Sequence, residues 1–297
     1  MSKIWFGLDI NPATAEVASA LRRAQMADRL GFDLITAQDH PYNRHFLDTW
    51  TLLAVLAGYT ERVRLGTNVA NVPLRAPALL AKQAASLDVL TGGRMELGIG
   101  AGAFWRGIAA LGGPERAPRE AFLAFREALH IIRGMWDSAG QSFSFSGDFY
   151  TVNGVVPGPA PVGAGRIWVG AGGPKMLELT GQLADGIWTS VAYVLPERLG
   201  WVNELIDAGA AQADRAPTAI RRGYNVMGSL HTSNGAGRLS EQGIHGDSIY
   251  WIETLTRLHA DHRQDAFVFW PSGDDTEMQI ERFAHEVIPA IRERFPT

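Results

Sequence analysis

Asp39 and His40 stand side by side at the end of the segment Gly-Phe-Asp-Leu-Ile-Thr-Ala-Gln-Asp-His. Leu34 and Ile35 in that segment are typical of the buried middle of a short strand, so the pair is expected at the strand's C-terminal end. A histidine can give or accept a proton near neutral pH, because its unperturbed pKa is about 6.5. The pair is therefore the first candidate for acid–base chemistry. The competing interpretation is a loop histidine bonded to a neighbouring carbonyl.

Two glycine-rich runs point to the binding of a ligand. Gly170-Ala171-Gly172-Gly173 lies between an apolar run and a helical pattern, where backbone N–H groups at a helix N-terminus attract a phosphate. Gly100-Ala101-Gly102, with Gly98 before it, lies at another strand end, where missing side chains let a flat ring approach the backbone. The structural alternatives are a tight strand-to-helix connection for the first run and close packing for the second. We favour packing at Gly98 and ligand contact at Gly100 and Gly102.

The composition favours one large domain that acts on small molecules. With 297 residues, 46% of them hydrophobic, residues 1–297 are expected to form a single domain around one core. The formal net charge of -4, without a basic run, gives no electrostatic reason to expect nucleic acid or an anionic membrane as a partner. The chain has no cysteine, which excludes disulfides, thiolate metal ligands and cysteine nucleophiles.

The N-terminal segment gives an indication of the cellular compartment. Residues 1–11 contain one lysine and a short apolar stretch broken by Asp9, which is a poor signal peptide. No uncharged apolar run approaches the ~18 residues that a membrane span needs. The sequence therefore predicts a soluble cytoplasmic protein.

Short apolar runs alternate with longer stretches of helical period along the chain. Strands are predicted at Ile4–Ile10, Asp33–Ala37, Val63–Val69, Arg94–Ile99, Ile167–Gly170, Ile187–Ser190, Arg221–Met227 and Ala266–Trp270. Helices are predicted at Thr14–Leu30, Asp48–Thr60, Ala76–Leu90, Pro118–Trp136, Lys175–Leu183, Pro196–Asp214, Asp247–Asp261 and Thr276–Arg294. This alternation favours an α/β fold in which eight parallel strands close into a (β/α)8 TIM barrel, and an open doubly wound sheet is the alternative. In such a barrel the chemistry lies at the C-terminal ends of the strands.

The residues at the predicted strand ends are mostly small, polar and uncharged. They are Asp9, Asn11, Asp39, His40, residues 68–71, 100–102 and 170–173, Thr189, Ser190, Asn225, Trp270 and Pro271. They include no His-x-His pair, carboxylate cluster or nucleophile elbow, so metal-dependent, two-carboxylate glycoside and serine hydrolysis all lack their parts. Small residues and amides are suited to holding a large flat ligand.

Two long irregular segments interrupt the alternation, at residues 137–166 and 228–246. Loops of this length in a compact domain are usually functional or disordered. The second follows a strand at the catalytic face, so it is a candidate cover for a bound ligand. In the first, Phe143–Val152 is a candidate hairpin that packs elsewhere.

Several motifs resemble one known family. The segment from Pro77 to Arg94 reads Pro-x-x-Leu-Ala-Lys-x-x-x-Ser-Leu-Asp-x-Leu-x-Gly-Gly-Arg, and Leu-Gly-x-Gly-x-Gly follows at 97–102. The segment from Ile167 to Lys175 reads Ile-Trp-Val-Gly-Ala-Gly-Gly-Pro-Lys, with Ala-Asp-Gly at 184–186. Together with the C-terminal stretch 267–288, these closely resemble the luciferase-like superfamily of flavin- and deazaflavin-dependent oxidoreductases.

The resemblance implies a TIM barrel that holds a phosphate-bearing tricyclic cofactor, coenzyme F420 or FMN, across its strand ends, and a homodimer. It implies that His40 faces the cofactor as proton donor or acceptor beside Asp39, and that the Asn68-Val69 peptide is cis. The residues that it assigns to cofactor binding are Asp39, His40, Asn68, Val69, Ala70, Gly100, Ala101, Gly102, Gly170, Ala171, Gly172 and Gly173. No metal is implied.

One departure from the family narrows the range of expected substrates. Sugar-phosphate dehydrogenases of the superfamily carry a Glu just after the Gly-x-Gly-x-Gly run, whereas this chain has Ala103-Phe104-Trp105. The missing acid argues against a sugar phosphate. Phe104 and Trp105 suggest an aromatic pocket, and the alternative is that they anchor the loop.

Three functions are compatible with these residues. The leading hypothesis is an oxidoreductase that uses reduced F420 for hydride transfer with a small organic substrate. One alternative is an FMN-dependent monooxygenase that uses reduced flavin and dioxygen. The other, from a different class, is a flavin-binding protein without turnover. Dependence of turnover on His40 separates an enzyme from a carrier.

Overall fold

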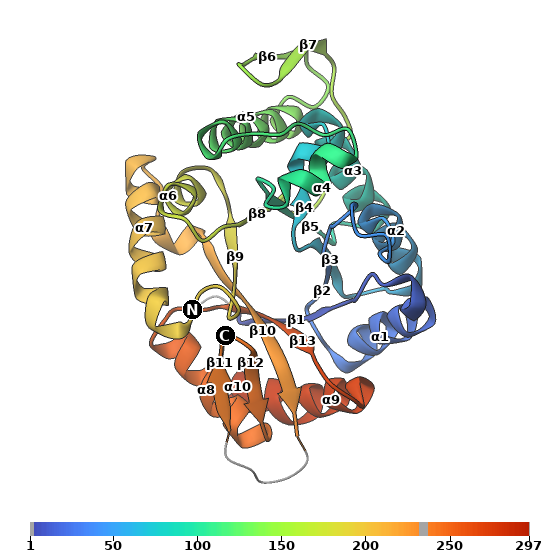
Figure 1. Ribbon diagram of the computed structural model, residues 1–297, viewed down its shortest axis with the longest axis vertical. Coiled ribbons are helices and arrows are strands. Elements are labelled where there is room, and N and C mark those ends of the chain that lie inside the picture. Colours follow the sequence, from blue (N-terminus) through green and yellow to red (C-terminus); the bar gives the residue numbers. More distant parts are fainter. Residues whose placement is uncertain (1–2, 232–236, 297) are drawn as a thin grey trace.

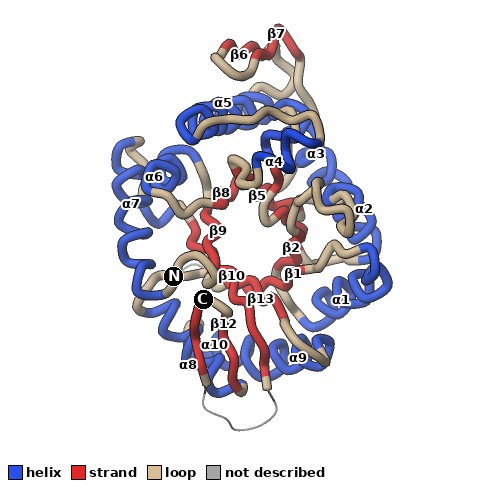
Figure 2. The backbone as a smooth tube through the Cα atoms, viewed as in Figure 1, coloured by secondary structure: helices blue, strands red, loops and turns tan. Residues whose placement is uncertain are grey.

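The structure is a computed structural model that describes residues 3–231 and 237–296. Its centre is a closed barrel of eight parallel strands surrounded by helices (Figures 1 and 2). The strands are β1 (Trp5–Asp9), β2 (Leu34–Ala37), β3 (Arg64–Thr67), β5 (Met95–Gly100), β8 (Ile167–Gly170), β9 (Gly186–Ser190), β10 (Arg221–Leu230) and β13 (Ala266–Pro271). They pair in this order around the barrel, with β10 joined to both β9 and β13. The predicted TIM barrel is confirmed.

Helices cover the barrel on all sides (Figure 2). They are α1 (Val17–Leu30), α2 (Thr49–Tyr59), α3 (Pro77–Leu90), α5 (Pro118–Asp137), α6 (Pro174–Leu183), α7 (Leu199–Gln212), α8 (Ser248–Ala260), α9 (Thr276–Arg282) and α10 (Ile288–Arg294). Each predicted helix is present. The apolar residues that recur at helical spacing form one face of each helix, and packing that face against the sheet removes it from water. Within residues 3–231 and 237–296, no helix is long and apolar enough to cross a membrane.

The structure differs from the predicted elements in a short added helix, in the third strand and in the last helix, and also in the second long segment. A short helix, α4 (Trp105–Ala110), was not expected from the sequence. The third strand ends at Thr67, and a separate strand, β4 (Ala70–Asn71), pairs with β5. The last helix contains a π-helical turn at Phe283–Val287, with α9 before it and α10 after it.

The two long segments contain strands of their own. The hairpin β6 (Phe143–Ser146) and β7 (Thr151–Val155) lies beyond α5 (Figure 1), as the sequence predicted. The carboxylate of Glu127 on α5 holds it by accepting backbone N–H groups of residues 148–150. In the second segment, β10 continues to Leu230, and β11 (Arg238–Ser240) and β12 (Gly243–Gly246) follow. Residues 232–236 of the predicted ligand cover lie outside the described residues.

Aromatic side chains fill the barrel toward the N-terminal ends of the strands. The ring centroids of Trp5 on β1 and Trp168 on β8 are 6.1 Å apart, although these strands are not neighbours in the sheet. Trp168 also stacks on Trp188, with centroids 4.2 Å apart. A Cβ at Gly186 would lie 2.3 Å from Trp168, and one at Gly223 would lie 2.2 Å from Trp188. Glycines therefore make room for these rings in the barrel interior.

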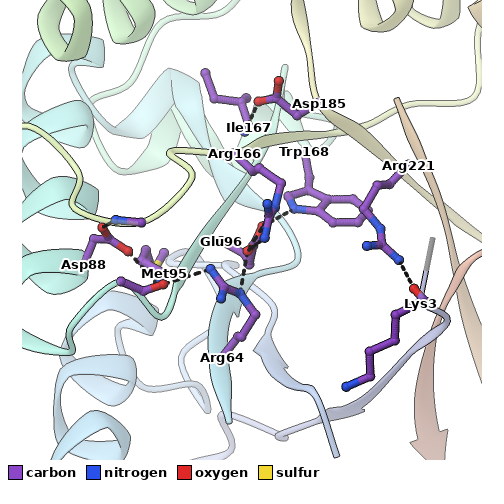
Figure 3. Close-up of polar contacts among 12 residues, drawn as sticks. Lys3, Arg64, Asp88, Met95, Glu96, Arg166, Ile167, Trp168, Asp185 and Arg221 are labelled. Carbon is purple, nitrogen blue, oxygen red and sulfur yellow. Dashed lines mark hydrogen bonds and ion pairs between the residues drawn. The ribbon is translucent and has the colours of Figure 1, made fainter. Parts of the chain in front are cut away.

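A charged network closes the same end of the barrel (Figure 3). The Glu96 side chain is 1% exposed and accepts hydrogen bonds from Arg64 Nε at 2.6 Å and from Trp168 Nε1 at 2.7 Å. Arg166 pairs with the same carboxylate at 3.1 Å. Burying a carboxylate is tolerated here because donors satisfy its oxygens. With this end filled, the opposite end of the barrel is left for a ligand.

Candidate active site

The predicted site residues gather at the C-terminal ends of the barrel strands. Asp39 and His40 follow β2, and Asn68 follows β3. Residues 100–102 start at the last residue of β5, and residues 170–173 start at the last residue of β8. Because the eight strands are parallel, these positions lie on one face of the barrel.

His40 is solvent-accessible and has aromatic neighbours. Its Nδ1 lies 2.8 Å from the Tyr42 hydroxyl. The imidazole and Phe46 rings have centroids 6.3 Å apart. Partial removal of water lowers the pKa of His40 from its usual value, and the negative charge of Asp39 offsets part of this shift. The neutral imidazole is therefore favoured more than in a histidine that is fully surrounded by water.

Asp39 does not use its carboxylate to hold the imidazole. Its side chain is 1% exposed and accepts hydrogen bonds from Arg75 Nε and from a second guanidinium nitrogen, both at 2.8 Å. It also accepts one from the backbone N–H of Asn71 at 2.9 Å. Asp39 therefore fixes the end of β2 and acts on His40 through its charge.

Arg75 fastens both ends of the loop that carries His40. Besides Asp39, it binds the carboxylate of Asp48 at 2.7 Å. Asp48 is also the N-cap of α2, where it accepts the backbone N–H of Thr51 at 2.9 Å. In the middle of the loop, Phe46 forms a backbone bridge with residue 13, in the segment after β1. The catalytic loop is thus attached to three elements.

The Asn68-Val69 peptide is cis, as the resemblance implied. Asn68 Nδ2 donates to Asn225 Oδ1 at 2.7 Å, and Asn225 Nδ2 donates back at 3.3 Å. Trp270 Nε1 also donates to Asn225 Oδ1 at 3.3 Å. These amides link β10 and β13 to the segment after β3, at the barrel mouth.

The glycines of the two runs serve different purposes. A Cβ at Gly98 would lie 2.0 Å from a backbone oxygen, which confirms the packing interpretation at that residue. At Gly100 and Gly170 a Cβ would lie 2.8 Å from Cγ2 of Val69. Gly102 has a φ of +89°, in the region that favours glycine. Packing against Val69 therefore explains why residues 100 and 170 are glycines, and backbone conformation explains residue 102. The sequence assigned all three to ligand contact.

Gly172 and Gly173 present open space instead. A Cβ at either one would meet no other atom of the described residues within 4 Å. They follow Ala171 and lead directly into α6, whose first residue is Pro174. Open backbone at the N-terminus of a ten-residue helix is suited to a phosphate group. The geometry fits the predicted phosphate site at these two residues.

Small-molecule pockets in proteins enclose about 300–1,000 Å³, and a cavity of about 600 Å³ opens on this face. It is lined by Asp9, Asn11, Glu16, Ser19, Arg23, Gln38, Phe46, Trp270, Pro271, Gly273 and Thr276. Burial raises the pKa of Asp9 well above its usual value, although a hydrogen bond from Thr36 lowers it in part. Nearby, Oδ1 of Asn71 is buried and has no hydrogen-bond partner among the described residues. An unsatisfied acceptor at a barrel mouth fits a polar ligand such as the predicted tricycle.

Arg75 and Tyr42 were missed in reasoning from the sequence. Arg75 is the sole charged residue between Arg64 and Lys82, and a lone charge in so long an uncharged stretch is a usable signal for a buried ion pair. Tyr42 belongs to no motif. Its position beside His40 depends on the path of the loop, which only the tertiary structure provides.

The sequence profile of the luciferase-like monooxygenase family matches residues 4–244. The chain belongs to this family. The match includes the loop that carries His40, both glycine runs and seven of the eight barrel strands.

Three proteins illustrate the luciferase-like relationship. A 5,10-methylenetetrahydromethanopterin reductase of Archaeoglobus fulgidus is 34% identical over 66% of this chain and 55% of its own length. A phthiodiolone/phenolphthiodiolone dimycocerosates ketoreductase of Mycobacterium tuberculosis is 35% identical over 58% of this chain and 45% of its own length. The matches thus span about half the length of these curated relatives. An F420-dependent secondary alcohol dehydrogenase, solved with an F420-acetone adduct, has a TM-score of 0.86 at 20% identity, covering 98% of this chain and all of that one. This last likeness shows the fold alone.

Proposed function

We propose that this luciferase-like protein is an oxidoreductase that uses reduced F420 for hydride transfer with a small organic substrate, and that His40 handles the proton. One observation carries the proposal: a histidine whose pKa is lowered by burial and an open glycine turn at the N-terminus of α6 share the mouth of one barrel. The reductases named among its relatives support hydride transfer from the cofactor to the substrate.

Two segments at the barrel mouth support the proposed cofactor site. The backbone at Gly172 and Gly173 would hold its phosphate, and the strand-end segment from Asn68 to Asn71 would support its ring. When bound, the reduced deazaflavin supplies the hydride. Phe46 and Trp270 would exclude water from the reacting atoms, and His40 would hold a proton at the imidazole edge that faces the ligand.

The substrate that we propose is a small carbonyl compound or alcohol of largely apolar character. Tyr42 and Phe46 lie near His40, and the Phe104 ring meets that of Tyr42 edge to face with centroids 5.2 Å apart. Ala103 stands where sugar-phosphate dehydrogenases carry an acid. Activated enones and simple secondary alcohols are the first compounds to assay.

An FMN-dependent monooxygenase is the second candidate, because the matching family profile is described as monooxygenase. The two cofactors differ in one decisive atom. A deazaflavin has carbon where flavin has the oxygen-reactive nitrogen, so reduced F420 reacts poorly with dioxygen. Oxygen consumption coupled to substrate oxidation would favour FMN.

We also propose that two copies of the chain associate. An apolar patch on α2 and α3 is exposed, formed by Val55, Tyr59, Leu79, Val89 and Leu90. Leu90 is 83% exposed, an unusual environment for so large an apolar side chain. A second copy of the same patch would remove these side chains from water, and the family resemblance implies a dimer.

Titration of the purified protein with F420 and with FMN tests the cofactor. We expect saturable fluorescence change with one of them at one site per chain. Gly172→Asp should weaken that binding by at least tenfold, or ~1.4 kcal/mol, because it places a carboxylate where the phosphate should bind. Gly172→Ala is the matched control and should bind within a few fold of the unmodified chain, because the added methyl group has no atom of residues 3–231 or 237–296 within 4 Å. Absence of saturable binding of either cofactor at tens of micromolar would refute the proposal.

A further inference from the structure

The Tyr42 hydroxyl is held at Nδ1 of His40 by packing from outside their loop. The Tyr42 ring meets Phe104 edge to face, at an interplanar angle of 71°. A Cβ at Gly107 would lie 2.4 Å from Phe104 Cδ1 and 2.8 Å from Tyr42 Cγ, so both rings rest against the backbone of α4. The unexpected helix α4 therefore fixes the position of the phenol. The 2.8 Å contact between the hydroxyl and Nδ1 follows from this placement.

A neutral imidazole needs a second group before it can act as an acid. If it gives up the proton on Nε2 alone, it becomes an imidazolate anion, which is strongly disfavoured near neutral pH. A proton arriving at Nδ1 at the same time avoids this anion. Tyr42 holds such a proton, because burial and the nearby charge of Asp39 raise the pKa of its phenol.

We propose that Tyr42 is the positioning residue and proton relay for His40, passing its hydroxyl proton to Nδ1 as Nε2 protonates the substrate. The inference rests on the proposed function. The bound reduced cofactor would supply the hydride for the substrate carbon, where the carbonyl π bond breaks. The oxygen takes the proton from Nε2, the Tyr42 O–H bond breaks and an Nδ1–H bond forms. Water then returns a proton to the half-buried phenolate. Oxidation of an alcohol runs through the same bonds in reverse.

Few other charges act on this pair. Asp39, at the end of β2, is the charged group that raises the pKa of both His40 and Tyr42. Its own charge is paired with Arg75. The neighbours from α4 and from the rest of the loop are Phe104 and Phe46, which carry no charge. The pH dependence of the site should therefore report mainly on the imidazole and the phenol.

Tyr42→Phe tests the relay, because it removes the hydroxyl and keeps the ring that packs on Phe104. The first measurement is ¹⁵N NMR of His40 without cofactor. In the unmodified chain we expect the Nε2–H tautomer, with Nδ1 accepting from the phenol, and in the variant a mixture of tautomers. Tyr250→Phe, on α8, is the matched control and should leave the His40 signals unchanged.

The second measurement is the pH profile of carbonyl reduction. Without the relay, the imidazole must be protonated before it can act, so turnover of Tyr42→Phe should fall about tenfold per pH unit above the pKa of His40. The unmodified chain should keep its rate over the same range. Gly107→Ala, which displaces the phenol and keeps its hydroxyl, should reproduce the steeper profile.

The outcomes separate the relay from the proposed function. An unchanged pH profile in Tyr42→Phe, or an equal loss at every pH, overturns the relay while leaving the oxidoreductase in place. If no substrate is turned over, the proposed function fails. The NMR result still decides whether Tyr42 donates its hydrogen bond to Nδ1. An Nδ1–H tautomer in the unmodified chain would mean that it does not, and would overturn the relay.

Discussion

At the scale of single residues, His40 has the contacts of an acid–base group and Asp39 has those of an anchor. His40→Ala should lower turnover by ~10²- to 10⁴-fold, the usual contribution of a positioned acid–base group. Affinity for the cofactor should stay within a few fold, because the phosphate would be held at Gly172 and Gly173 on the far side of the barrel mouth. Steady-state kinetics and a binding titration check both. Full turnover in this variant would move the proton role to another group or to water.

Asp9 should destabilise the folded protein at neutral pH. Its raised pKa means that the folded protein binds this proton more tightly than the unfolded chain does. Asp9 therefore increases the free energy of unfolding at pH values below 3.8, its ordinary pKa. This contribution is lost as the pH rises through the higher pKa that Asp9 has in the folded protein. Asp9→Asn should raise the melting temperature at pH 8 by about 2–4 °C, the shift expected for roughly 1 kcal/mol. The difference should shrink toward pH 4.

Thermal melts of Asp9→Asn between pH 4 and pH 8 provide the measurement. Asp274→Asn, at an exposed aspartate after β13, should show no such trend. A melting temperature that is unchanged or lower at pH 8 would contradict the burial penalty assigned to Asp9. The penalty is consistent with a site residue, because groups retained for function are often costly to stability.

At the scale of elements, Arg75 holds together the end of β2, the start of α2 and the loop between them. Arg75→Met should destabilise the protein by ~3–5 kcal/mol, because it leaves the Asp39 carboxylate buried without its cation. Turnover should fall as well, since the loop that carries His40 loses its attachment. Denaturant unfolding and steady-state kinetics measure the two effects.

A double variant separates the two contributions of this ion pair. Asp39→Asn combined with Arg75→Met removes both charges, so it should be more stable than Arg75→Met alone. Recovery of stability without recovery of turnover would show that the loop depends on the ion pair for its position. A double variant as unstable as the sum of the two single variants would exclude strong coupling between Asp39 and Arg75.

At the scale of the whole molecule, the apolar patch on α2 and α3 predicts the oligomeric state. The unmodified chain should sediment as a dimer at micromolar concentration. Leu79→Glu combined with Leu90→Glu should shift it to monomer, because charges would be buried in the interface. Val162→Glu, at a residue 63% exposed in the segment before β8, should leave the dimer intact. A monomeric unmodified chain would rule out this association.

We also propose that residues 1–297 form one domain. The first and last strands of the barrel, β1 and β13, are hydrogen-bonded neighbours, so the fold closes only when both ends of the chain are present. Arg292 on α10 supports this closure by binding Asp33, the residue before β2, at 2.9 Å. Truncation at either end should therefore disrupt the whole barrel.

The sequence by itself determined the barrel and which candidate residues lie at the ends of its strands. Apolar runs at strand length, separated by amphipathic helices, specify eight parallel units because each strand and helix must bury one face. The Asp39-His40 pair and the Gly172-Gly173 turn were located at strand ends for the same reason. These signals are local, because each depends only on the types and spacing of residues that are close together in the sequence.

Only the tertiary structure decided which side chains meet across those ends. Asp39 pairs with Arg75, 36 residues away, and Asn68 with Asn225, 157 residues away. Gly100 and Gly170 proved to make room for Val69, and the position of Tyr42 depends on a helix that the sequence did not predict. No periodicity encodes such contacts, because they depend on how loops from different strands pack once the barrel has closed.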